Sequence, residues 1–468
     1  MFIPEQSLDI MVQGGMLLNL DDYLDQMPHV NSSEKIEKSL NFARKFKSAG
    51  TGGLYGIPCE CGDTYVKYSW INSTERNALR LRWDTYEEIG APEIKDFDDL
   101  IDVMEQMQKA RPTAEDGTPC FGTILNNGSD SSFWACMVLW YRWQGYFEHQ
   151  LPYLLEADMY NGEYHSILDK DSLYYKGLKW YNKVYRRGLM DPDSINNDRP
   201  TQKVKVDGGY AQIPSGYLPG WAPTYLEYHI PGTKVFYAPV TTYGDSRYLI
   251  GINANTKNVE ACLAYLDMLA DPEAYLNIIQ GPDGEFWYSD DQGNAYLTEA
   301  GTKWFEDGHN DSSGFTLSNG ETLEMWNSPF LARNGTLTRF GDGKGGYRTA
   351  SILGWTEFSE IGTSSKVFDQ WRATTGHENW KEWLGDDYPL QDVFSFTSLP
   401  DDNMQLMIDA IKDKVTTASW KMVYSSSDSE FDTLWDQMVA DCNGLDANSI
   451  MEWRLADLEN AKQIRDSL

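Results

Sequence analysis

Apolar residues recur at helical spacing along much of the chain, and capping residues or glycines mark where these stretches begin and end. Residues 96–109 carry an apolar face behind a capping aspartate, and residues 172–187 carry another that stops at Gly188. The same spacing predicts further helices at residues 31–49, 131–146, 259–270, 404–420 and 430–442, and a charged terminal helix from Ala447. The C-terminal part of the chain is therefore expected to be helical.

Short apolar or alternating runs between these helices predict strands. They lie at residues 54–58, 64–70, 121–125, 208–213 and 248–253. A hairpin is expected at residues 289–297, turning on Asp291-Gln292-Gly293-Asn294. Strands that alternate with helices indicate an α/β fold with largely parallel sheets.

The length and composition of the chain add two expectations. At 468 residues it exceeds the size at which a single core keeps growing, so more than one lobe is expected. Aromatic residues make up 13% of the chain, which is high. Such rings either fill the core or are displayed in a cleft, where they stack on a ligand.

Charge and cysteine content exclude several classes of function. Acidic residues outnumber basic ones 71 to 39, for a net charge of −32, and no basic cluster interrupts them, so nucleic acid is not an expected partner. The six cysteines are sparse, and most are expected to be free and buried rather than part of a disulfide framework or metal site. No apolar run approaches the roughly 20 residues of a membrane helix, so no membrane span is predicted.

A search for catalytic, cofactor and metal motifs finds none. Residues 341–346 are glycine-rich but lack the spacing and the Lys-Ser/Thr of a phosphate loop, and residues 212–216 lack the first glycine of a nucleophile elbow. The six histidines show no metal-ligand spacing, and residues 290–294 are expected to form a turn rather than a calcium loop. No catalytic residue, cofactor or metal is therefore predicted. A carboxylate pair for glycoside hydrolysis stays open, because any two of the acidic residues could meet in space.

Aromatic residues do occur in loops that follow predicted strands: Trp70, Tyr217, Trp221 and Trp355. In open α/β sheets, ligands bind outside the carboxyl ends of the strands, so a ring at such a place tends to face a cleft. Flat rings pack on the C–H faces of sugars, while polar side chains bond the hydroxyls around the edge. The sequence thus favours carbohydrate as the ligand.

Several segments, taken in order, resemble the extracellular solute-binding proteins of ABC sugar importers, the family typified by maltose-binding protein. The segments are LYGIP at residues 54–58, the helix and turn at 173–191, GYAQ at 209–212 followed by Trp221, and GINANTKN at 251–258. The resemblance spans nearly the whole chain. It implies a two-lobed periplasmic-binding-protein-like fold of type II, with mostly parallel sheets flanked by helices and a helical C-terminal region.

The resemblance also implies lobes and ligand contacts. The first lobe would comprise residues 1–115 and 246–345, and the second residues 116–245 and 346–468. An oligosaccharide would bind in the cleft between them. The positions that match the family's ligand contacts are Glu5, Gln6, Glu60, Trp134, Trp221 and Trp355, beside the loop aromatics Trp70 and Tyr217. Cys59 and Cys61 depart from what relatives carry beside Glu60.

Partners and location follow from the same resemblance. The family's members are extracytoplasmic, periplasmic or anchored as lipoproteins, and deliver the sugar to permease subunits of the importer; a monomer is expected. They begin with a signal peptide and a strand-helix-strand unit that this sequence does not show, so an N-terminally truncated chain is expected. A glycoside hydrolase and a glycan-binding surface protein remain the alternatives, and a peptide-like ligand stays open.

Overall fold

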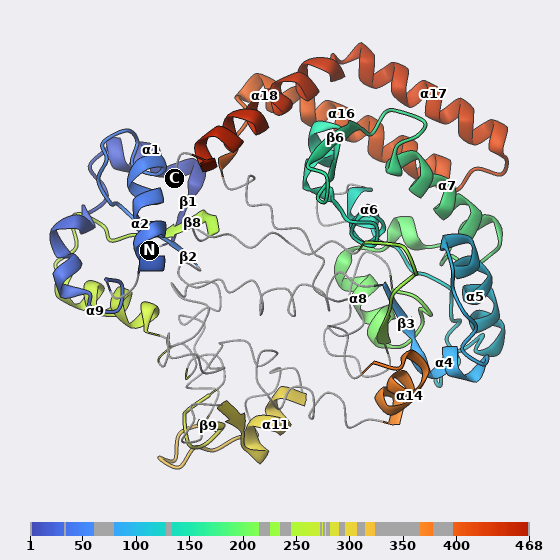
Figure 1. Ribbon diagram of the computed structural model, residues 1–468, viewed down its shortest axis with the longest axis horizontal. Coiled ribbons are helices and arrows are strands. Elements are labelled where there is room, and N and C mark those ends of the chain that lie inside the picture. Colours follow the sequence, from blue (N-terminus) through green and yellow to red (C-terminus); the bar gives the residue numbers. More distant parts are fainter. Residues whose placement is uncertain are drawn as a thin grey trace. The chain divides into compact units, whose positions relative to one another are not determined.

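The computed structural model describes residues 2–31, 34–59, 79–127, 133–214, 225–234, 245–271, 274, 277, 281–289, 295–306, 314–322, 366–377 and 396–466 (Figure 1). The chain divides into two compact units, each made of two separate stretches. The first unit combines Met1–Asn72 with Val240–Thr363, and the second combines Ser73–Pro239 with Ser364–Leu468. The sequence placed the changes of lobe after residues 115, 245 and 345, whereas the units change after residues 72, 239 and 363.

The first unit is built on a small sheet in the order β1-β8-β2, with antiparallel pairing throughout. Its strands are β1 (Phe2–Pro4), β8 (Asp245–Ile250) and β2 (Ile57–Cys59). The helices that share a core with this sheet are α1 (Glu5–Gln13), the 3-10 helix η1 (Leu20–Gln26), α2 (Glu34–Phe46) and α9 (Val259–Ala270). Apolar residues from these helices and from the sheet form one core, because each element carries a buried face.

A hairpin and one helix form a second part of the first unit. The strands β9 (Trp287–Ser289) and β10 (Ala295–Leu297) pair antiparallel, and α11 (Glu299–Glu306) follows. The predicted hairpin is confirmed, while its turn lies outside the described residues. Phe286 packs edge-on against Trp304 at 5.5 Å between ring centroids, which fixes α11 to the hairpin.

The second unit contains a mixed sheet. Strands β3 (Leu79–Arg82) and β7 (Tyr225–Tyr228) pair antiparallel, and the Arg82 N–H donates to the Gln212 carbonyl at 2.8 Å. Residues 211–213 lie next to residues 121–125 in the sheet and contact them through the parallel bridge Phe121↔Ala211. Residues 121–125 in turn contact residues 189–191 through the parallel bridge Thr123↔Met190. Every pairing between named strands is antiparallel in the described part of the chain, so the expected predominance of parallel sheets is not confirmed.

Helices and a smaller sheet surround this mixed sheet. The helices are α4 (Trp83–Glu88), α5 (Phe97–Ala110), α6 (Trp134–Arg142), α7 (Leu173–Arg186), the 3-10 helix η3 (Ser194–Asn196), α8 (Arg199–Asp207) and α14 (Lys366–Thr375). The smaller antiparallel sheet contains β4 (Tyr146–Phe147), β5 (Leu155–Asp158) and β6 (Glu163–Ser166), with the 3-10 helix η2 (Glu148–Tyr153) between β4 and β5.

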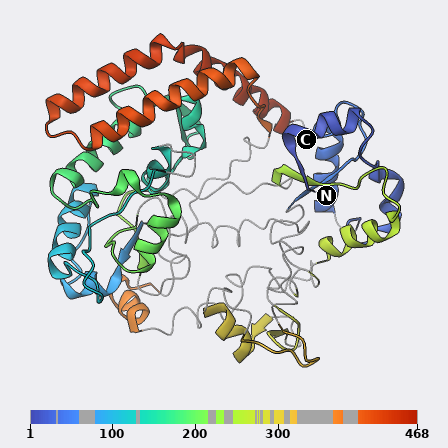
Figure 2. The same ribbon diagram turned by 180° about the vertical axis from the view of Figure 1, so that it is seen from behind.

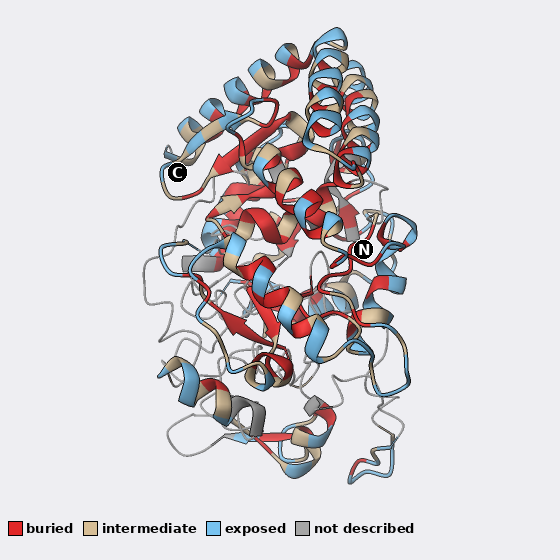
Figure 3. Ribbon diagram, turned by 90° about the vertical axis from the view of Figure 1, so that its right-hand side faces the viewer, coloured by how far each residue is buried: buried red, intermediate tan, exposed pale blue. Residues whose placement is uncertain are grey.

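Three long helices complete the second unit: α16 (Asp402–Val423), α17 (Asp428–Gly444) and α18 (Ala447–Asp466). Helix α16 packs on α7, and α17 contacts α7 through Tyr175, whose ring meets Trp435 and whose hydroxyl donates to Asp432; both helices lie beside α7 in Figures 1 and 2. The Tyr174 and Ser419 hydroxyls are 2.8 Å apart, and the Asn182 side-chain amide donates to main-chain carbonyls at the end of α16. Figure 3 shows buried and exposed residues alternating along these helices, as amphipathic packing requires.

The predicted helices are largely confirmed. Helix α9 has the predicted bounds, and α5 and α7 begin behind the capping side chains of Asp96 and Ser172. The strand predicted at residues 208–213 is shorter, because Gly208 and Gly209 close α8, a helix that the sequence did not predict. The strand predicted at residues 64–70 lies outside the described residues.

Candidate functional site

Three extended segments of the second unit end together at one edge of its sheet. Segment 121–127 lies between segments 211–213 and 189–191: the Phe121 N–H donates to the Tyr210 carbonyl, and past the 3-10 helix η3 the Asn197 carbonyl accepts the Asn127 N–H at 2.9 Å. Both neighbours run parallel to it at the bridges. Because parallel strands point the same way, their carboxyl ends meet at this edge, which is where α/β sheets bind ligands.

Buried polar side chains hold that edge in place. The Ser194 hydroxyl accepts the Leu125 N–H at 3.0 Å, and the Asn197 amide donates to the Leu125 carbonyl at 3.1 Å. The Asn126 amide donates to Gln202, which itself donates to the main chain of the same segment. All four side chains are buried, so these bonds are made in a low-dielectric setting and fix the segment that leads into the edge.

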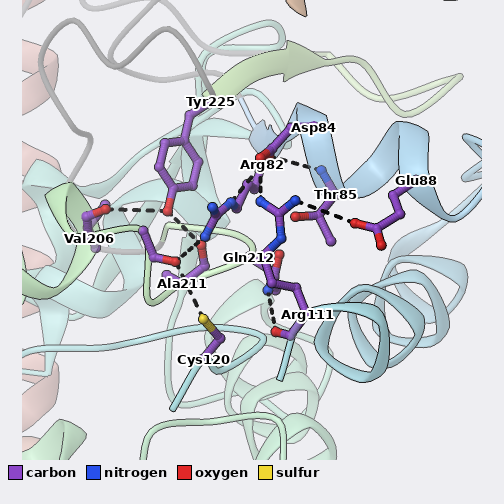
Figure 4. A network of polar contacts seen from close by, with 11 residues as sticks. Arg82, Asp84, Thr85, Glu88, Arg111, Cys120, Val206, Ala211, Gln212 and Tyr225 are labelled. Carbon is purple, nitrogen blue, oxygen red and sulfur yellow. Dashed lines mark hydrogen bonds and ion pairs between the residues drawn. The ribbon is translucent and has the colours of Figure 1, made fainter. Parts of the chain in front are cut away.

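A second polar network fixes segment 211–213 (Figure 4). The Tyr225 hydroxyl donates to the Ala211 carbonyl at 2.6 Å, and the Gln212 amide donates to the Arg111 carbonyl at 3.3 Å. The Arg82 guanidinium donates to the Gly209 carbonyl, which also accepts the Cys120 thiol. The network therefore anchors the chain just before residues 215–224, the stretch that contains Tyr217 and Trp221.

Asp84 is the charged centre of this network. It accepts hydrogen bonds from Arg82 at 3.2 Å and from Arg111, as the dashed lines of Figure 4 show. Burial raises the pKa of the Asp84 carboxyl, but the bonds and charges of Arg111 and Arg82 outweigh it and hold the pKa below its usual value. The carboxylate is therefore ionised at neutral pH, and its part is to bind two arginines rather than to transfer protons.

Helix α6 begins near the same edge, and its first residue is Trp134. The Trp134 side chain is 7% exposed, and its indole N–H has no hydrogen-bond partner among the described residues. No side chain caps the helix start either. A buried donor without a partner is unusual in a folded protein, and Trp134 is one of several described residues with such a group, Trp83 and Trp143 among them.

An open groove of about 770 Å³ adjoins Asn127 within the second unit. The Trp420 indole N–H donates to the Asn127 side-chain oxygen at 2.8 Å, and the rings of Trp420 and Tyr424 stack at 5.8 Å and 16°. The residues that line the groove are Asn127, Ile195, Asp413, Thr416, Thr417, Trp420, Lys421, Tyr424, Glu430 and Leu434. Trp420 is only 4% exposed, so its ring packs into the wall of the groove, and the half-buried Tyr424 ring and the polar side chains line the groove surface.

The charged groups of the groove are Asp413, Lys421 and Glu430. Hydrogen bonds from the Ser426 main-chain N–H and hydroxyl lower the pKa of Glu430, so this carboxylate is ionised at neutral pH. Within the described ranges, no group of three or more His, Cys, Asp or Glu side chains is placed to hold a metal ion. The four described cysteines, Cys120, Cys136, Cys262 and Cys442, are free, and all but Cys262 are buried.

The structure describes only part of the predicted ligand-binding set. Trp134 lies at the start of α6, and Glu5 and Gln6 are the first residues of α1, although their side chains are outside the described part. Five predicted residues lie wholly outside the described residues: Glu60, Trp70, Tyr217, Trp221 and Trp355. The sequence reasoning missed Asn127, Trp420 and Tyr424. The two rings lie four residues apart on one helix face, but this spacing is also that of a core-facing stripe and does not single them out.

Comparisons by sequence find no relative: no family model matches the chain, and no curated protein matches it. Comparisons by structure find similar proteins. An HMO-binding, ABC-transporter-associated solute-binding protein from Bifidobacterium longum infantis is 14% identical, with a TM-score of 0.59 over 98% of this chain and 87% of that chain. The S. pneumoniae ABC-transporter substrate-binding protein FusA, as an EF-hand mutant bound to fructo-nystose, gives a TM-score of 0.61 at 14% identity, over 100% and 87% of the two chains.

A third structure agrees. An extracellular solute-binding protein from Bifidobacterium longum subsp. infantis is 15% identical, with a TM-score of 0.55 over 98% of this chain and 87% of that chain. This chain has the fold of an ABC-transporter solute-binding protein. The predicted solute-binding-protein fold is thereby confirmed, and it extends over nearly all of the chain. Among the described helices of this solute-binding fold, none is both long and apolar enough to cross a membrane.

Proposed function

We propose that the protein binds an oligosaccharide outside the cytoplasm and delivers it to the permease subunits of an ABC importer. The observation that carries this proposal is the structural likeness over 98–100% of the chain to solute-binding proteins, among them an HMO-binding protein and FusA bound to fructo-nystose. At 14% identity the likeness establishes the fold, so the ligand class is inferred rather than inherited.

The described part of the second unit supports a carbohydrate ligand. Asn127 lies at its sheet edge and the partnerless indole of Trp134 lies at the start of α6, beside a groove lined by the half-buried Tyr424 ring and by polar side chains. These are the groups that recognise sugars: flat apolar faces for the C–H surface, and amides and carboxylates for the hydroxyls. The predicted contacts Glu5, Gln6, Glu60, Trp70, Trp134, Tyr217, Trp221 and Trp355 form the proposed ligand-binding set.

The rest of the proposal concerns what the protein does with the sugar. The described geometry of the second unit supports binding, because the polar side chains at its sheet edge are placed to form hydrogen bonds. Asp84 is bound to Arg82 and Arg111, which leaves it no part as an acid or a base. We infer a monomer that carries out no covalent chemistry and works at the outer side of the membrane.

Thermal melting against a panel of oligosaccharides tests the proposal. One class of sugar should raise the melting temperature, because a ligand that binds the native state stabilises it by mass action. Replacing Trp221 with Ala should abolish the shift, and Trp134→Phe, which removes the indole N–H and keeps an aromatic ring, should reduce it.

The same samples, assayed for products by mass spectrometry, separate binding from hydrolysis. Intact sugar after prolonged incubation is the expected result. Shortened sugars would establish a glycoside hydrolase instead. A panel in which no saccharide shifts the melting temperature would rule out carbohydrate as the ligand, and peptides would then be tested next.

A further inference from the structure

Arg82, the last residue of β3, lies between the two places where residues 215–224 join the described part of the second unit. Its main-chain N–H donates to the Gln212 carbonyl at 2.8 Å. On the other side of β3, Arg82 stands opposite Tyr225, the first residue of β7. The described residues before and after 215–224 therefore lie on either side of Arg82.

Two side chains join these ends to each other. The Tyr225 hydroxyl donates to the Ala211 carbonyl at 2.6 Å, and the Arg82 guanidinium donates to the Gly209 carbonyl (Figure 4). Tyr225 is 3% exposed and the Arg82 side chain 13% exposed. Both hydrogen bonds are thus largely shielded from water, where such bonds are stronger.

The Arg82 side chain is itself held on its other side. Its Nε–H donates to one oxygen of Asp84 at 3.2 Å, and Arg111 binds the other oxygen of that carboxylate. Gly209 permits the close approach of the guanidinium, because its φ is +76° and a Cβ there would lie 2.8 Å from Arg82 Nη1. The contacts at both ends of 215–224 therefore belong to one fixed network.

This network bears on binding because residues 215–224 include Tyr217 and Trp221, two members of the proposed ligand-binding set. Holding both ends of a chain segment reduces the number of conformations open to it. A ligand that contacts a restricted segment loses less free energy in ordering it, so its affinity is higher.

We propose that Arg82 and Tyr225 are positioning residues for ligand binding, which raise the affinity contributed by Trp221 without touching the ligand. The inference rests on the proposed function and deepens it, because it names residues outside the ligand-binding set that control its affinity.

Tyr225→Phe tests the inference with the smallest change, since it removes only the hydroxyl that donates to Ala211. The matched control is Tyr174→Phe, the same change at another buried tyrosine, whose hydroxyl lies 2.8 Å from the Ser419 hydroxyl on α16. Arg82→Lys is a second variant: it keeps a positive charge beside Asp84, but an ammonium lacks the planar fork that reaches both Asp84 and the Gly209 carbonyl.

The full-length wild type and each variant are titrated by calorimetry with neutral gluco-, galacto-, manno- and fructo-oligosaccharides. The temperature is set well below the melting temperature of every protein, so that all of them are folded. Trp221→Phe and the double variant Tyr225→Phe/Trp221→Phe are titrated in the same way, because residues that act on one contact give losses that do not add.

Tyr225→Phe and Arg82→Lys should each lose about three- to tenfold in affinity, which corresponds to the loss of one hydrogen bond. Tyr174→Phe should bind within about twofold of the wild type, because distant sites act independently. The Tyr225→Phe change should cost less affinity in the Trp221→Phe protein than in the wild type, which a purely structural role would not produce.

Three results would overturn the positioning role and leave the proposed function standing: unchanged affinity in Tyr225→Phe and Arg82→Lys, an equal loss in Tyr174→Phe, or losses that add in the double variant. Failure of every saccharide to bind the wild type would instead contradict the proposed function, and this inference with it.

Discussion

At the scale of single residues, the carboxyl edge of the second unit depends on small buried polar groups. Ser194 is fully buried, and its hydroxyl is the acceptor for the equally buried Leu125 N–H. A buried main-chain N–H that loses its hydrogen-bond acceptor has given up its bonds to water, and no bond within the protein replaces them. The Ser194 hydroxyl oxygen therefore stabilises residues 121–127, the segment that ends in Asn127.

Ser194→Ala tests this dependence, because it removes only that oxygen. We expect the free energy of unfolding to fall by about 1–3 kcal/mol, the cost of an unsatisfied buried donor. Urea denaturation measures it. The control is Ser429→Ala at an exposed position of α17, which should stay within about 0.5 kcal/mol of the wild type. Equal stability of both variants would show that Leu125 finds another acceptor.

A titrating pair in the first unit makes a second residue-scale prediction. The His29 ring lies 2.7 Å from the Asp267 carboxylate, which also accepts the N–H groups of His29 and Val30. The hydrogen bond with Asp267 raises the pKa of His29 against the opposing effect of burial. A raised pKa in the folded state means that protonated His29 stabilises the fold below the unfolded pKa, near 6.5, and that this contribution disappears as the pH rises through the folded pKa.

His29→Gln should therefore be less stable than the wild type at acidic pH, and the difference should shrink as the pH rises. Urea unfolding of both proteins at pH values on either side of 6.5 measures that difference. A difference that stays constant with pH, or grows at alkaline pH, would mean that the charge of His29 contributes nothing to stability.

The candidate site was only partly predictable at this scale. A ring in a loop after a strand can be recognised from sequence, whereas Trp134 lies in a helix and was predicted as a ligand contact only from the family resemblance. Trp420 could not be separated from core, because an apolar helix face looks the same whether it packs on another helix or borders a groove. Asn127 could not be found because its importance comes from the Trp420 ring, 293 residues away in the chain.

At the scale of elements, close helix packing depends on glycine at one position. Gly177 of α7 faces α6, and a Cβ added there would lie 2.7 Å from the Trp140 indole nitrogen and 3.1 Å from the Met137 sulfur. The same indole N–H donates to the Leu173 carbonyl at the start of α7 at 2.9 Å. The two helices approach closely because residue 177 has no side chain.

Gly177→Ala should consequently destabilise the protein, although alanine is the better helix former by about 1 kcal/mol. We expect a lower melting temperature, because the Trp140 ring is buried and cannot move aside without losing its bond. Gly444→Ala is the matched control: nothing lies within 4 Å of a Cβ at that helix position, so this variant should be neutral or more stable. A stabilised Gly177→Ala would show that α6 and α7 can separate slightly at no cost.

The elements also show where sequence reasoning succeeds. Helices α5, α7 and α9 were predicted well, because a capping side chain or an apolar face of several turns is a local signal. Helix α8 was missed, since it buries only Gln202 and Val206 and so shows little apolar periodicity. The ladder that joins segments 121–125, 189–191 and 211–213 depends on partners distant in sequence, which no local pattern contains.

At the scale of the whole molecule, the net charge of −32 is the dominant electrostatic feature. Like charges repel one another more in the compact state than in the expanded unfolded chain. Because salt screens this repulsion, we expect the melting temperature to rise as sodium chloride is increased from low concentration to about 0.5 M. Differential scanning calorimetry measures the shift. A melting temperature that falls over this range would mean that attractive ion pairs outweigh the net repulsion.

The division of the second unit into two stretches, Ser73–Pro239 and Ser364–Leu468, has a consequence for the order of folding. The ribosome releases α7 long before α16, yet Tyr174 of α7 is 245 residues from its partner Ser419. The apolar face of α7 therefore stays without its packing partner α16 while residues Val240–Thr363, which belong to the first unit, are synthesised. Such long-range closure slows folding and leaves surface open to aggregation, so a chain that stops before residue 364 cannot finish this core.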